Sequence, residues 1–122
     1  MTRCLLVDDN IDTRREVSRV FGHLGFELAE SANANEALDH CRVHGPDVVV
    51  VSQRIGETGP RDFVRRVRRA NRQKAPVVLV YSDRPNAESI GRMIIDGAAE
   101  FLMRPFDQDL LAFKLKQVGL LR

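Results

Sequence analysis

The sequence predicts an α/β protein built on a doubly wound, five-stranded parallel sheet. Short apolar runs bounded by turn residues alternate five times with longer stretches in which apolar residues recur at helical spacing. One of these runs, Val48 to Val51, consists of β-branched residues only, which is typical of a central strand buried on both faces. Because right-handed crossovers distribute the helices over both faces of such a sheet, a three-layer sandwich follows.

The first half of the chain contains two strand-then-helix units. The first strand is expected at 4–7, and the helix after it carries one apolar face formed by Val17, Val20, Phe21 and Leu24. A second strand is expected near 26–29. Asn33, with Glu36 three residues later, has the spacing of a helix-capping pair, and the inward residues that follow are Ala37, Leu38 and Cys41.

Three further units follow the central strand. A helix near 60–70 is expected to turn Phe63, Val64 and Val67 inward, and Pro76 introduces a fourth strand at 77–81. The next helix ends at Gly97, and Ile90 and Ile94 are among its expected core residues. The fifth strand spans 100–103, and Asp107 caps a last helix whose expected apolar face consists of Leu110, Leu111, Leu115 and Val118.

Composition and charge narrow the class of protein. A chain of 122 residues with 43% apolar content suits one domain over 1–122, and the sequence predicts no output domain. Its 19 basic and 17 acidic side chains give no bulk charge that favours nucleic acid or a membrane. Cys4 and Cys41 fall at apolar positions and are expected to be reduced core residues. The N-terminal stretch has no long apolar run, so we expect a cytoplasmic protein.

Polar residues follow four of the expected strands. Asp8 and Asp9 come after the first, Ser52 after the third, Ser82 after the fourth and Arg104 after the fifth. In open parallel sheets, ligands bind outside the carboxyl ends of the strands, near the point where strand order reverses. These residues are therefore the candidate site.

Two segments carry a family resemblance that extends over the whole chain. Residues 5–10, LLVDDN, and residues 97–107, GAAEFLMRPFD, resemble the acidic pair and the fifth-strand signature of response-regulator receiver domains. The end of the chain is similar to single-domain chemotaxis-type receivers. The resemblance implies a flavodoxin-like sheet with strand order 2-1-3-4-5, a non-enzymatic module of two-component phosphorelay signalling, and a Mg²⁺ site that includes Asp8 and Asp9.

Ser52 occupies the position where the family usually has its phosphorylated aspartate. It lies 30 residues before Ser82 (52 to 82), and Ser82 lies 15 before Gly97 and 22 before Arg104, which fits the family's spacing. Asp47 cannot substitute, because it precedes the strand and belongs at the opposite edge of the sheet. A hydroxyl in place of the carboxylate removes both the phosphoryl acceptor and a metal ligand.

Other family positions are kept or altered. Ser82 matches the switch hydroxyl and Phe101 the switch aromatic, while Arg104 stands where a lysine is usual, before Pro105, whose preceding peptide bond is commonly cis in receivers. A guanidinium is a planar fork, so the exchange is not conservative. We expect Arg104 to pair with Asp8 or Asp9 and to fix one conformation.

These departures predict a degenerate receiver that acts by protein–protein interaction, has no catalytic residue and needs no cofactor, with Mg²⁺ bound weakly if at all. The expected partners are a kinase, a phosphotransferase or a motility component, or a second copy of the chain; no membrane and no nucleic acid is expected. One alternative is a Mg²⁺-dependent receiver phosphorylated on Ser52 or another residue.

Two surfaces outside the site remain as binding candidates. Arg65 and Arg69 share a face of an arginine-rich helix. This face is either a solvated surface or a site for phosphate-bearing ligands such as a cyclic dinucleotide, which some related receivers bind through arginines. By analogy with receivers, the partner face is expected around the fourth helix and the fifth strand, and it includes Arg92, Phe101 and Phe106.

Overall fold

The parallel sheet is present with the expected strand order. The computed structural model describes residues 2–55, 59–71, 73–84, 87–95 and 97–121. The five strands are parallel and are ordered β2-β1-β3-β4-β5. Their bounds are Arg3–Val7 for β1, Glu27–Ser31 for β2, Val48–Ser52 for β3, Val77–Ser82 for β4 and Glu100–Met103 for β5.

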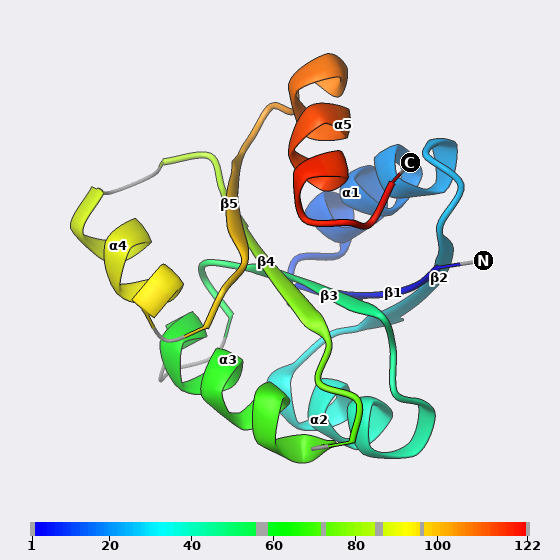
Figure 1. Cartoon of the computed structure of the whole chain (residues 1–122), viewed down its shortest axis with the longest axis vertical. Coiled ribbons are helices and arrows are strands. Elements are labelled where there is room, and N and C mark those ends of the chain that lie inside the picture. The colour runs from blue at the N-terminus through cyan, green and yellow to red at the C-terminus, as the bar shows by residue number, and fades with distance from the viewer. Residues whose placement is uncertain (1, 56–58, 72, 85–86, 96, 122) are drawn as a thin grey trace.

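Five helices cover the two faces of the sheet. They are α1 (Ile11–His23), α2 (Ala34–His44), α3 (Gly59–Ala70), α4 (Ala87–Ile95) and α5 (Gln108–Gln117). Figure 1 shows α1 and α5 together on one side of the sheet, and α2, α3 and α4 on the other. The three-layer sandwich predicted from the sequence is therefore confirmed.

The core consists of two apolar clusters separated by the sheet, because alternate strand residues point to opposite faces. In the central strand β3, Val49 and Val51 join the cluster under α2 and α3, whereas Val48 and Val50 join the cluster under α1 and α5. Each cluster contains one cysteine: Cys41 in the first and Cys4 in the second. Both are free, buried thiols, as predicted, and burial raises the pKa of Cys4 to about 12 and that of Cys41 to about 11.

The predicted helix caps at Asn33 and Asp107 are confirmed. The side chain of Asn33 accepts the amide hydrogen of Glu36 at 2.9 Å, and that of Asp107 accepts the amide hydrogen of Leu110 at 3.0 Å. The glycine after α2, Gly45, ends that helix in the left-handed conformation at φ 54°.

Two expected core positions lie outside the core. Ile94 is 44% exposed and Leu110 is 53% exposed. Both residues stand at the border of an apolar stripe, where helical spacing alone does not decide which side of the border reaches the sheet. The buried face of α5 is instead formed by Leu111 and Leu115.

None of the helices in the described ranges combines the length and the apolar character needed to cross a bilayer.

Candidate functional site

The carboxyl edge of the sheet brings the predicted site residues together. Asp8 follows β1, Ser52 and Ser82 are the last residues of β3 and β4, and Arg104 follows β5. Ser52 and Tyr81 are register partners in the central pair β3–β4, and Ser82 is the partner of Met103 in β5. Parallel strands ending in register thus place side chains that are far apart in the sequence along one edge.

The acidic pair is divided between two environments. Asp8 is 1% exposed, whereas Asp9 is exposed. Oδ1 of Asp8 accepts the amide hydrogen of Asn10 at 2.9 Å, and its main-chain oxygen accepts a hydrogen bond from Arg14 at 2.8 Å. The same Asn10 caps α1 through its side chain. The start of α1 therefore holds Asp8 in place.

Tyr81 is a site residue that sequence reasoning missed. Its hydroxyl donates to Oδ2 of Asp8 at 2.6 Å, and both residues are buried. Burial of the ring, together with the hydrogen bond to Asp8, raises the pKa of the phenol above its ordinary value, so the hydroxyl stays protonated and remains a donor. The signal was a tyrosine directly after the apolar run Val77 to Val80 of a buried strand, since a buried tyrosine hydroxyl needs a partner.

Ser52 is buried beside Tyr81 and is 3% exposed. Its hydroxyl oxygen accepts the amide hydrogen of Arg54 at 3.2 Å, and the amide of Gln53 donates to the main-chain oxygen of Tyr81 at 2.8 Å. The end of β3 is thereby fixed to β4 by the backbone. Ser82 is half-buried, and its hydroxyl oxygen accepts the amide hydrogen of Arg84 at 3.1 Å.

Arg104 does not pair with either aspartate, so that expectation is wrong. Its guanidinium donates to Oε2 of Glu16 on α1 at 2.7 Å. Glu16 is one of the acidic side chains within reach of a long arginine, and the sequence separation of 88 residues hid it from pattern analysis. The peptide bond between Arg104 and Pro105 is cis, as the resemblance implied.

Phe101 points into the core, where it is 7% exposed within the cluster under α2 and α3. Phe106 is half-buried and lies on the other side of the sheet, where its ring meets that of Tyr81 edge-on with the centroids 6.2 Å apart. The two aromatic residues therefore do not form one surface.

The side chains of Arg65 and Arg69 are exposed on α3. Within the same helix Arg68 donates to the main-chain oxygen of Gly97 at 3.2 Å, and Arg66 pairs loosely with Asp62. Arg92 pairs with Glu88 along α4. Several of these arginines thus take part in contacts within the protein.

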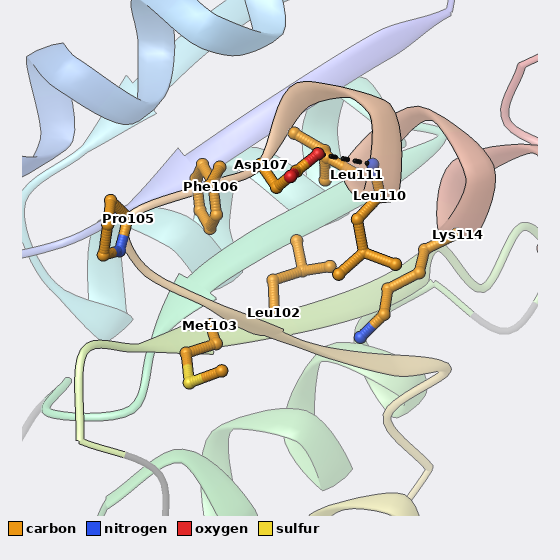
Figure 2. Close-up of a pocket in the computed structure, with 8 residues that line it drawn as sticks. All are labelled: Leu102, Met103, Pro105, Phe106, Asp107, Leu110, Leu111 and Lys114. Carbon is orange, nitrogen blue, oxygen red and sulfur yellow. Dashed lines mark hydrogen bonds between the residues drawn. The ribbon is translucent and has the colours of Figure 1, made fainter.

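A groove runs between β5 and α5. It encloses about 180 Å³ and is lined by Leu102, Met103, Pro105, Phe106, Asp107, Leu110, Leu111 and Lys114. Figure 2 shows the leucine side chains gathered between the strand and the helix, with Lys114 at one end and Pro105 at the other. The ammonium group of Lys114 donates to the main-chain oxygen of Phe101 at 3.1 Å.

The described residues at the carboxyl edge fit a divalent cation poorly, because they offer it two carboxylates, Asp8 and Asp9, and no third. Mg²⁺ prefers near-octahedral oxygen ligands, several of them carboxylates or waters. Both carboxylate oxygens of Asp8 accept hydrogen bonds, and Ser52 offers no carboxylate. Within the part of the chain that the structure describes, no three His, Cys, Asp or Glu side chains are grouped so that they could hold a metal ion.

Sheet order, acidic pair and cis peptide together define a receiver-type signalling module. The chain belongs to the response-regulator receiver domain family, whose model matches residues 4–116. It is 27% identical to the chemotaxis protein CheY1 of Helicobacter pylori, covering 95% of both chains. It is also 30% identical to the regulatory protein AtoC of Escherichia coli over 91% of this chain.

The similarity extends to solved structures. The chemotaxis protein CheY4 of Vibrio cholerae superposes with a TM-score of 0.84 at 27% identity, covering 97% of this chain and 98% of that one. The chain spans only 24% of AtoC and 54% of the transcriptional regulator CrdR of Helicobacter pylori, which are longer proteins. The shared part is therefore the receiver module.

Proposed function

We propose that this chain is a cytoplasmic receiver module that does not take a phosphoryl group on aspartate and signals through protein–protein contacts. The observation that carries the proposal is Ser52, which ends the central strand β3 where the family spacing puts the phosphorylated aspartate. An acyl phosphate requires a carboxylate at that position, and a serine hydroxyl cannot form one.

The other groups at this edge support the same function. Phosphoryl transfer depends on metal and cationic groups aligned on the transferred phosphate. Here the carboxylate of Asp8 accepts a hydrogen bond from Tyr81, and the guanidinium of Arg104 donates to Glu16 on α1. Neither group is oriented for that chemistry, which favours a module that binds without reacting.

The surface around the β5–α5 groove is the proposed docking face. Large apolar side chains stand exposed there, Met103 at 59%, Leu110 at 53% and Phe113 at 56%. Exposed apolar groups of this size beside a concave groove are typical of protein contact sites. We propose that a histidine kinase, a histidine phosphotransferase or a motility component of two-component signalling binds this face.

Incubation with acetyl phosphate and Mg²⁺, followed by intact mass spectrometry, tests the absence of phosphorylation. We expect no phosphoryl adduct, while a receiver that has the usual aspartate, treated in parallel, becomes modified. A stable adduct located on Ser52, or an acid-labile adduct on any aspartate, would contradict the proposal.

The docking face is tested with purified histidine kinases and phosphotransferases of the same organism. Leu110→Asp and Phe113→Asp should abolish binding measured by interferometry. Val43→Asp is the matched control, because Val43 is an apolar residue that is 76% exposed on α2, in the opposite layer. Equal loss of binding in all three variants would contradict the assignment of this face.

A further inference from the structure

We infer that Tyr81 weakens the binding of divalent cations at the carboxyl edge by holding Asp8, so that the serine at position 52 is only one of two features of this receiver that disfavour a metal ion. The inference rests on the proposed function. It assigns a role in metal affinity to Tyr81, which lies on β4 and outside the family motif.

The first step is the occupancy of Asp8. One carboxylate oxygen accepts the amide hydrogen of Asn10 at 2.9 Å, and the other accepts the hydroxyl hydrogen of Tyr81 at 2.6 Å. Asp8 is 1% exposed, so its carboxylate has almost no contact with bulk solvent. A cation at Asp8 would therefore meet a carboxylate whose two oxygens each accept a hydrogen bond already, and it would compete with these two donors for the oxygen lone pairs.

The second step concerns which donor could be displaced. The amide of Asn10 belongs to the residue that caps α1, so its position is fixed by the backbone at the start of the helix. The hydroxyl of Tyr81 belongs to a side chain and is not fixed by the backbone. Its ring packs edge-on against Phe106, with the centroids 6.2 Å apart. Tyr81 is therefore the group that competes with a cation for Asp8.

The third step links Tyr81 to Ser52. The two residues are register partners in neighbouring parallel strands, so their side chains leave the sheet on the same face. A small serine at 52 stands beside a large ring at 81, and both are buried. Replacing Ser52 with aspartate would return a carboxylate to this edge but would leave the hydroxyl of Tyr81 on Asp8.

The test compares four proteins: the wild type, Ser52→Asp, Tyr81→Phe and the double variant. Mn²⁺ binding is followed by electron paramagnetic resonance and Mg²⁺ binding by calorimetry. We expect the double variant to bind the ion at least about tenfold more tightly than Ser52→Asp, the scale on which groups bonded to metal ligands alter affinity. Equal affinity of Ser52→Asp and the double variant would overturn the inference.

A matched control removes a different buried hydroxyl from the same edge. Ser31 ends β2 and is 6% exposed, and its main-chain oxygen, which accepts the amide hydrogen of Asp8 at 3.2 Å, remains in an alanine variant. Ser31→Ala combined with Ser52→Asp should bind no more tightly than Ser52→Asp alone. A gain equal to that of Tyr81→Phe would show that hydroxyl loss in general, rather than Tyr81, opens the edge.

A second readout does not depend on the folding of the phenylalanine variants. The chain contains one tyrosine and no tryptophan, so its ultraviolet emission reports on Tyr81. In Ser52→Asp, an ion that binds Asp8 competes with the Tyr81 hydroxyl for the same carboxylate, so the tyrosine emission should change with the ion concentration. Ion binding with unchanged emission would overturn the inference.

These outcomes are separate from those of the proposed function. Phosphorylation of the wild type would contradict the proposed function and would leave the comparison of Ser52→Asp with the double variant intact. Equal metal affinity of those two variants would remove the role of Tyr81 while the wild type could still be inert to acetyl phosphate.

Discussion

Two aspartates hold opposite edges of the sheet, and they do so by different means. Asp8, at the carboxyl edge, is buried and is held by a neutral hydroxyl and a backbone amide. Asp47, at the amino edge, is half-exposed; it accepts the amide hydrogen of Arg3 at 2.7 Å and pairs with the ammonium group of Lys74 at 3.0 Å.

The difference indicates that Asp8 belongs to a retained functional site, whereas Asp47 has a structural role. Asp47 joins the starts of three strands, because its backbone also bonds to Arg3 and to Val77. A half-exposed, ion-paired carboxylate is an ordinary surface arrangement. A buried carboxylate with no cationic side chain on its oxygens is costly, and sheets of this class place such groups where chemistry occurs. The carboxyl edge thus keeps the form of a reactive site after its reactive group has been replaced.

Of the changes considered, alkaline pH should lower the free energy of unfolding most, because it ionises Tyr81 at the carboxyl edge. The pKa of Tyr81 is higher in the folded protein than the ordinary value of 10.0. Its contribution to stability is therefore complete below pH 10 and declines as the pH rises above that value. We expect the absorbance change of phenol ionisation to coincide with unfolding followed by circular dichroism. Ionisation near pH 10 in the folded protein would contradict the buried hydrogen bond.

Tyr81→Phe should have the next largest effect, a loss of about 1.5 to 3 kcal/mol in the free energy of unfolding. This is the scale of a hydrogen bond to a charged group, and the variant leaves the carboxylate of Asp8 short of a donor. Urea denaturation of the wild type, Tyr81→Phe, Asp8→Asn and the double variant measures the coupling between the two side chains. Strictly additive losses would indicate that the two groups do not interact.

Asp47→Asn tests the amino edge and should cost about 1 kcal/mol or less, because the pair with Lys74 is half-exposed and screened. The hydrogen bond from the Arg3 amide, followed by Lys74, lowers the pKa of Asp47 below its ordinary value of 3.8. Its contribution is therefore present above pH 3.8 and is lost as the pH falls through the lower folded value. The difference between variant and wild type should vanish in acid; a difference that persists at low pH would refute this origin.

Arg104→Met should have the smallest effect, within about 1 kcal/mol, because the side chain of its partner Glu16 is 54% exposed. The change keeps the length of the aliphatic stem and removes the charge. Glu16→Gln should produce a similar small shift in thermal unfolding. A loss as large as that of Tyr81→Phe would indicate that Arg104 stabilises more of the carboxyl edge than its bond to Glu16.

The backbone and the site positions could be predicted from the sequence, but the side-chain partners could not. The run Val48 to Val51 and the caps at Asn33 and Asp107 are local signals, and the spacing from Ser52 to Arg104 placed the strand ends. The partners of Arg104 and Tyr81 lie on elements distant in the sequence, at separations of 88 and 73 residues. Where a long side chain has several acceptors within reach, packing decides between them.

The two cysteines can serve as probes of local opening in the two halves of the core. Cys4 and Cys41 lie in different clusters, 2% and 0% exposed, and each thiol has a raised pKa. A thiol reagent reaches such a group only when the surrounding layer opens. The rate of alkylation at Cys4 therefore measures how often the apolar cluster under α1 and α5 opens. The rate at Cys41 measures the same for the cluster under α2 and α3. The wild-type protein can therefore show whether its two core clusters open cooperatively or independently.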